Sequence, residues 1–134
     1  MRQPAYFLCH GGGPWPWMQG PIRRLLRHLE QGLRELPAQL PARPSAILVV
    51  SSHWEEKAFS FTSSAAPGMV YDYDGFPPET YRIRYASPGA PALASRAADL
   101  LRSAGCDAAL NDIRGYDHGT YSLLQPMVPQ ADIP

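Results

Sequence analysis

The sequence lacks three features that mark specialised classes of protein. It has no excess of one charge, because 12 basic and 12 acidic residues cancel, so no overall field attracts nucleic acid or anionic lipid. Its apolar runs, such as Ala46–Val50, are far too short to span a bilayer. It has only two cysteines, Cys9 and Cys106, which is typical of a reduced intracellular protein and not of a disulfide scaffold. We therefore expect a cytoplasmic protein whose partners are neither nucleic acid nor membrane.

Four segments have the pattern of β-strands. The runs Ala5–Cys9 and Pro44–Trp54 are apolar almost throughout, as expected of strands that are buried on both faces. The segment Ala58–Ser64 alternates polar and apolar residues, which predicts a half-exposed strand. A further short strand is predicted over Asp107–Asp112.

Three segments between these predicted strands have helical signals. Leucines recur at helical spacing from Pro21 to Leu36, Ala90–Gly105 is amphipathic and ends in a glycine, and Gly119–Val128 predicts a short helix. The 134 residues suffice for one domain with a core but not for two. The order of elements predicts an α/β fold with a mixed central β-sheet flanked by helices.

Three histidines occupy positions suited to chemistry. His10 follows the first predicted strand, His53 lies near the end of the second, and His118 is in the segment "GYDHGTY". Ligands of α/β domains bind beyond the carboxyl ends of the strands, and neutral imidazole is a frequent ligand of divalent transition metals. A single histidine is more simply interpreted as a partly buried residue without function. Taken together, however, His10 and His53 favour metal ligation.

Several neighbouring residues have two interpretations each. The segment "HGGG" (10–13) matches the oxyanion-hole segment of lipases and esterases, but the G-x-S-x-G elbow that a serine hydrolase requires does not occur in the sequence. Asp117 either perturbs the neighbouring imidazole for proton transfer or only caps the following helix. Five aromatic residues either form a wall for an aromatic substrate or only pack a loop on itself: Tyr71, Tyr73, Phe76, Tyr81 and Tyr85.

Four longer segments resemble those of one enzyme family. They are "FLCHGGGPW", "ILVVSSHWEE", "YDYDGFPPETYRIRYASPGAPALA" and "RGYDHGTYSLLQPMVPQADIP", in this order along nearly the whole chain. Together they are similar to the class III extradiol ring-cleavage dioxygenases, in the 4,5-DOPA dioxygenase (LigB-like) branch. Many members of that branch have "HGSP" where this chain has "HGGGP" at residues 10–14, and both forms keep the histidine and the turn.

The resemblance implies a site and a reaction. His10 and His53 match two metal ligands of the family, and His118 matches a pocket histidine that contacts substrate or oxygen and assists proton transfer. Asp117 is predicted to bind substrate together with His118. The implied metal is non-haem Fe(II), and Zn(II) can occupy the same site in structures of the family. The implied partners are O2 and a small catechol such as DOPA, whose ring opens next to its two hydroxyls.

The resemblance also implies that the chain is incomplete. The family's remaining ligands and a further pocket histidine belong to a C-terminal half that has no counterpart before Pro134. We therefore expect residues 1–134 to be a single partial catalytic domain with little activity by itself. Its open sheet edge favours association, such as a homo-oligomer. The alternative function is a non-enzymatic binding protein on the same fold, like the related Memo-type proteins.

Overall fold

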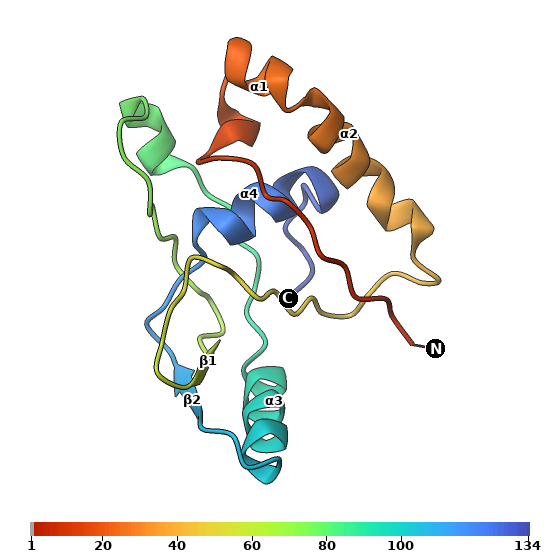
Figure 1. Ribbon diagram of the computed structural model, residues 1–134, viewed down its shortest axis with the longest axis vertical. Coiled ribbons are helices and arrows are strands. Elements are labelled where there is room, and N and C mark those ends of the chain that lie inside the picture. The colour runs from red at the N-terminus through yellow and green to blue at the C-terminus, as the bar shows by residue number, and fades with distance from the viewer. Residues whose placement is uncertain (1) are drawn as a thin grey trace.

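The computed structural model of the chain describes residues 2–134. Its α-helices are α1 (Pro21–Leu25), α2 (Arg27–Glu35), α3 (Pro91–Ser103) and α4 (His118–Met127). Its strands are β1 (Phe59–Thr62) and β2 (Ala108–Asn111), and three short 3-10 helices are η1 (Trp15–Trp17), η2 (Leu36–Gln39) and η3 (Pro78–Arg82). The strands and α3 lie at one end of the molecule and α1 and α2 at the other, with α4 between them (Figure 1).

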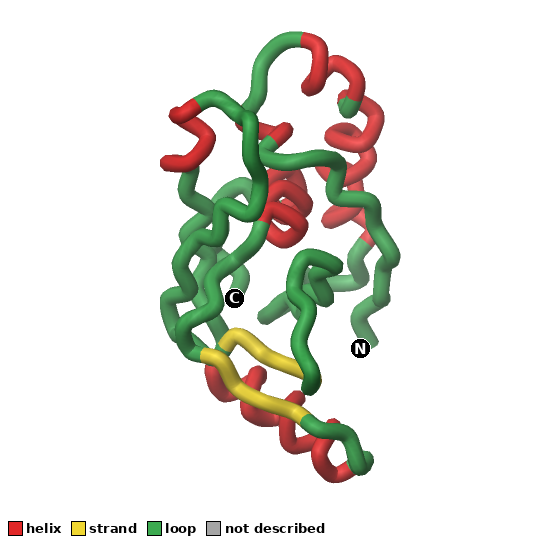
Figure 2. Tube along the Cα trace, turned by 60° about the vertical axis from the view of Figure 1, so that its left-hand side comes forward, coloured by secondary structure: helices red, strands yellow, loops and turns green. Residues whose placement is uncertain are grey.

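The strands β1 and β2 form a parallel pair joined through α3. Phe59 pairs with Ala108 and Thr62 with Asn111 at the two ends of the register. The helix α3 contacts both strands and runs along one face of them (Figure 2), as expected for a crossover between parallel strands. The predicted α/β class is confirmed, although the expected mixed sheet is a two-stranded parallel sheet among residues 2–134.

Two of the four predicted strands are wrong. Neither Ala5–Cys9 nor Pro44–Trp54 forms a regular strand in the described residues, and the second run contains a turn at Ser52 and His53. A strand that is buried on both faces needs hydrogen-bonded neighbours as well as apolar side chains. Here Val50 is 92% exposed and Phe7 is fully exposed, because no strand of the described chain lies alongside either run to cover it.

The predicted helix Pro21–Leu36 is interrupted at Leu26, whose φ of −94° and ψ of 11° leave the helical range. Beyond this break α2 buries Leu33, and Leu36 is buried in the turn that follows. The helix α2 thereby packs against α4. No helix within residues 2–134 has both the length and the apolar character needed to cross a membrane.

The helix α4 lies in the core and carries the predicted functional histidine His118 at its first position. Tyr121 of α4 is fully buried and forms a core cluster with Leu124 and Tyr85. Burial of an aromatic side chain of this size contributes a large share of the hydrophobic stabilisation of a small domain. Packing therefore fixes α4 and, with it, the position of His118.

Candidate metal centre

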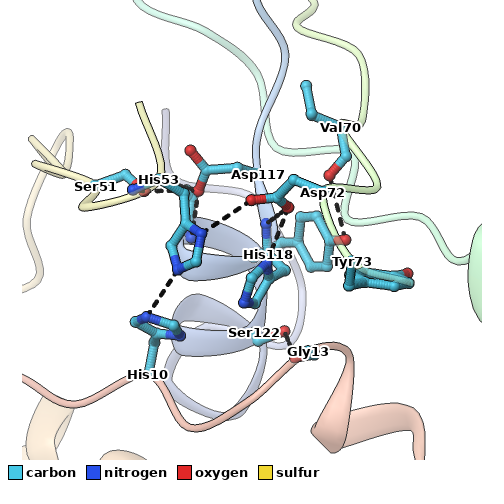
Figure 3. Close-up of polar contacts among 12 residues, drawn as sticks. His10, Gly13, Ser51, His53, Val70, Asp72, Tyr73, Asp117, His118 and Ser122 are labelled. Carbon is cyan, nitrogen blue, oxygen red and sulfur yellow. Dashed lines mark hydrogen bonds and ion pairs between the residues drawn. The ribbon is translucent and has the colours of Figure 1, made fainter. Parts of the chain in front are cut away.

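The three histidines that the sequence singled out converge in the structure (Figure 3). Each of His10, His53 and His118 places one ring nitrogen within 4.8 Å of the nitrogens of the other two. The Nε2 atoms of His10 and His53 are 3.2 Å apart. Two nitrogen ligands at about 2.1 Å from one metal, at angles of roughly 90–109°, lie about 3.0–3.4 Å apart. The observed separation therefore fits two ligands of one ion.

His10 is placed by the glycine turn that follows it. Gly11 has a φ of +77°, and a Cβ on it would lie 2.6 Å from the ring of Trp15, so any other residue there is both strained and crowded. The buried Trp15 donates its Nε1–H to the carbonyl of His10 at 2.6 Å. About one turn into α4, Ser122 donates its hydroxyl to the carbonyl of Gly13 at 2.8 Å. The glycines thus allow a sharp turn that fixes the backbone of His10 against α4.

The loop that carries His53 is bonded to the start of α4. The hydroxyl of Ser51 accepts from the backbone N–H of His53 at 3.2 Å and donates to Oδ1 of Asp117 at 2.8 Å. The guanidinium of Arg114 donates to the carbonyl of His53 at 3.1 Å and to Oδ2 of Asp117 at 3.3 Å. It also lies 5.4 Å from the ring centroid of Trp54. These contacts hold the loop on which His53 is carried.

Asp117 is the N-cap of α4. Its Oδ1 accepts from the backbone N–H and from the hydroxyl of Thr120, both at 3.0 Å. The side chain is 4% exposed, and its oxygens are occupied by Ser51, Arg114 and Thr120. Of the two interpretations of Asp117, the structure shows the cap. Its contact with substrate remains a prediction.

Asp72, which was not among the predicted site residues, is the carboxylate that contacts the imidazoles. Its Oδ1 lies 2.9 Å from Nδ1 of His118 and accepts the backbone N–H of His118 at 2.9 Å. Its Oδ2 lies 3.2 Å from Nδ1 of His53. The second contact has the distance of an ion pair but not the angle of a good hydrogen bond, so Oδ2 is buried without a hydrogen bond. The only local signal for this residue is the alternation of aspartate and tyrosine in "YDYD".

The electrostatics of the cluster favour the neutral, metal-binding form of His10. Burial lowers the pKa of His10, and the proximity of His118 and His53 lowers it further. Burial alone would raise the pKa of Asp72, but hydrogen bonds from His118 outweigh this effect and lower it. The buried Nδ1 of His10 has no hydrogen-bond partner among the described residues. Three imidazoles with one carboxylate behind two of them are a donor set that suits a divalent transition metal.

An aromatic cluster lies next to the histidines. The ring of Tyr73 is 5.8 Å from that of His118, between centroids. Rings of the same loop pack edge-on or tilted against each other, with centroids 5.2–6.3 Å apart: Tyr71, Tyr73, Phe76 and Tyr81. The fifth predicted member, Tyr85, belongs instead to the core, where its hydroxyl donates to the carbonyl of Val128. The loop therefore packs on itself and also presents Tyr73 to the site.

Comparison with known proteins identifies the family of this chain. The family described as "Catalytic LigB subunit of aromatic ring-opening dioxygenase" matches residues 4–134. A 4,5-DOPA dioxygenase extradiol of Escherichia coli is 38% identical over an alignment of 135 positions, which covers 99% of this chain and 46% of that protein. The dioxygenase tasH of Hapsidospora irregularis is 36% identical over an alignment of 137 positions, which covers 98% of this chain and 42% of that protein.

A plant relative gives the same result. A 4,5-DOPA dioxygenase extradiol of Portulaca grandiflora is 34% identical over 131 residues, which are 97% of this chain and 46% of that protein. The chain thus spans a little less than half the length of these relatives. The chain belongs to the family of catalytic LigB subunits of aromatic ring-opening dioxygenases.

Proposed function

We propose that this chain supplies the metal-binding part of an extradiol dioxygenase, which opens the ring of a small catechol such as DOPA with O2 at one non-haem Fe(II) ion. The observation that carries the proposal is the convergence of His10, His53 and His118, whose ring nitrogens lie within 4.8 Å of one another. Two relatives that are described as 4,5-DOPA dioxygenases support the substrate class. Zn(II) has similar ligand preferences, so the choice of iron is part of the proposal.

The residues of the chain have distinct roles in this reaction. When bound, Fe(II) supplies the Lewis acidity and the electron density that O2 chemistry on a catechol requires. His10 and His53 hold the ion through their facing Nε2 atoms. The contact of Asp72 with Nδ1 of His118 leaves Nε2 of His118 to accept a proton from a catechol hydroxyl and return it to the product.

The aromatic cluster binds the substrate in this proposal. A catechol ring that lies beside His118 and Tyr73 meets an aromatic edge or face, whose quadrupole favours offset or edge-on packing. The fixed rings around Tyr73 exclude water from one side of the substrate. Asp117, buried behind the histidines, supports this pocket by holding the start of α4.

We further propose that residues 1–134 are a partial catalytic domain that needs a complementary C-terminal part for full activity. The chain covers 42–46% of three relatives. Phe7, Leu48 and Val50 are exposed on two apolar runs that have the composition of buried strands. A second segment that paired with these runs would bury their side chains and complete the sheet. We infer a cytoplasmic location, because Cys9 and Cys106 are both free.

Anaerobic titration of the chain with Fe(II), followed by calorimetry, tests the metal site. The variant His53→Ala removes one of the two facing Nε2 atoms, and we expect its affinity for Fe(II) to fall at least about 100-fold. The matched control is His28→Ala, which removes an exposed histidine of α2 and should leave the affinity unchanged. Equal affinities for the two variants would overturn the proposed site.

Ring cleavage is tested with the product of the complete reading frame, by following the absorbance of the ring-opened semialdehyde formed from DOPA or catechol. We expect His118→Ala to bind Fe(II) and to lose cleavage, because the variant keeps both facing Nε2 atoms and loses the proton acceptor. Loss of Fe(II) binding in the same variant would make His118 a ligand instead. A parent protein that binds Fe(II) but cleaves no catechol would instead be a Memo-type binding protein on the same fold.

A further inference from the structure

One carboxylate lies behind two of the three histidines. Asp72 is in the loop between β1 and η3, and its side chain is 19% exposed. Its two oxygens face different rings: Oδ1 is 2.9 Å from Nδ1 of His118, and Oδ2 is 3.2 Å from Nδ1 of His53 (Figure 3). The two imidazoles therefore turn the same atom, Nδ1, towards one anion.

The chemistry of a carboxylate determines which nitrogen of each ring carries the hydrogen. An ionised carboxylate only accepts hydrogen bonds, so its contacts are favourable when both Nδ1 atoms are protonated. A neutral imidazole with hydrogen on Nδ1 has its free lone pair on Nε2. For His53, Nε2 is the atom that lies 3.2 Å from Nε2 of His10. The anion thus selects the tautomer whose lone pair points into the cluster.

The backbone around Asp72 is held in register with the start of α4. The N–H of Val70 donates to the carbonyl of Tyr116 at 2.7 Å, and the N–H of Tyr116 donates to the carbonyl of Gly68 at 2.8 Å. A Cβ on Gly115 would collide with the backbone of Gly68, so the two segments can approach this closely because residue 115 is glycine. These contacts fix the distance between Asp72 and His118 independently of the side chains.

Asp117 does not share this role, although it is the sequence neighbour of His118. Its oxygens accept from Ser51, Thr120 and Arg114. Asp72, which is 46 positions away from His118, contacts the imidazole instead.

We propose that Asp72 is a positioning residue that fixes the ring orientation and the tautomer of both His53 and His118. This inference rests on the proposed metal site and extends it to a residue that acts through the histidines. A carboxylate that bonds the distal nitrogen of a metal-ligating histidine also raises the basicity of the ligating nitrogen. Asp72 serves two rings at once, so its loss affects ligand and proton acceptor together.

The discriminating variant is Asp72→Asn, which has nearly the same shape. An amide offers one acceptor oxygen and one donor NH2 group, so only one of the two Nδ1 atoms then faces an acceptor. The other ring then faces a donor and changes to the tautomer with hydrogen on Nε2. Asp74→Asn, an exposed change two residues later in the same loop, is the matched control.

The first readout needs no metal. Long-range nitrogen–proton NMR of the metal-free chain, at a pH where imidazole is neutral, reports which nitrogen carries the hydrogen. We expect Nδ1–H for His53 and His118 in the parent and in Asp74→Asn, and Nε2–H for at least one of them in Asp72→Asn. Nε2–H on both rings of the parent would overturn the inference without any variant. Unchanged tautomers in a folded Asp72→Asn would overturn it as well.

The second readout is affinity for Zn(II), measured by calorimetry. We expect a loss of about 10–100-fold in Asp72→Asn, partial recovery in Asp72→Glu, which restores an acceptor-only group, and no change in Asp74→Asn. Parent-like affinity in Asp72→Asn would overturn the inference while the metal site stands. A tautomer change in a chain that binds no metal would support the positioning role and overturn the proposed function instead.

Discussion

Replacing Gly119 with alanine is expected to separate the stability of the fold from the function of the metal site. Gly119 is the second residue of α4 and faces the loop that carries His53. A Cβ at this position would lie 2.9 Å from Cδ2 of His53 and 3.0 Å from Oγ of Ser51. Carbon atoms in contact are ordinarily about 3.5–4.0 Å apart, so the imidazole of His53 would have to move by about 0.6 Å.

The substitution is expected to change metal affinity far more than stability. Metal–ligand distances tolerate deviations of only about 0.2 Å, so a displaced His53 no longer matches His10 across one ion. We expect metal affinity to fall by about tenfold or more, as when the outer contacts of a ligand are lost. Alanine is at most about 1 kcal/mol better than glycine within a helix, and less in the first turn. The free energy of unfolding should therefore change little.

Calorimetry with Zn(II) or anaerobic Fe(II), together with urea unfolding, measures both quantities on the same samples. The control is Gly32→Ala in α2, where a Cβ would meet no atom within 4 Å. We expect this control to gain about 1 kcal/mol of stability and to bind metal as the parent does. If Gly119→Ala binds metal as tightly as Gly32→Ala does, then α4 does not set the position of His53.

Three further predictions concern the stability of the fold. Tyr85→Phe removes the buried donor to the carbonyl of Val128 and should cost about 1 kcal/mol in urea unfolding, with metal affinity unchanged. Asp117→Ala removes the N-cap of α4 and should cost about 0.5–2 kcal/mol, whereas Asp117→Asn should retain most of the stability; equal losses in both would exclude the cap as the cause. Arg23 lowers the pKa of Glu30 from 4.5 to about 2, so the unfolded chain binds this proton more readily. The resulting stability is present above pH 4.5 and is lost as the pH falls towards 2, and thermal midpoints of Glu30→Gln should depend less on pH across that range.

The local elements of the fold were predictable because their signals lie within them. The segment Ala90–Gly105 has a proline near its start and a glycine at its end, and it forms α3 as Pro91–Ser103. The runs Ala5–Cys9 and Pro44–Trp54 were not predictable in the same way. Their composition shows a preference for burial, but a strand also requires a partner edge, and that partner lies elsewhere in the chain or in another segment.

The site was predictable only in part, for a related reason. The histidines could be recognised from the sequence, because a polar side chain that can bind a metal seldom lies beside a glycine turn or at the end of an apolar run. Asp72 was not visible, because its partner His118 is 46 positions away and the loop between them has no periodicity. Asp117 was instead considered as the carboxylate that acts on the imidazole of His118, because it is adjacent to His118 in sequence. The geometry of an N-cap, however, directs its side chain towards the backbone of Thr120.

The contacts around the histidines share one reference element, which is α4. His118 is its first residue. The backbone of His10 is held through the turn in which the carbonyl of Gly13 accepts from Ser122 of α4. The loop of His53 is held through Ser51, which donates to the N-cap of α4. A single buried helix therefore sets the relative positions of three side chains that come from distant parts of the sequence. It follows that loosening the packing of α4 displaces all three imidazoles together.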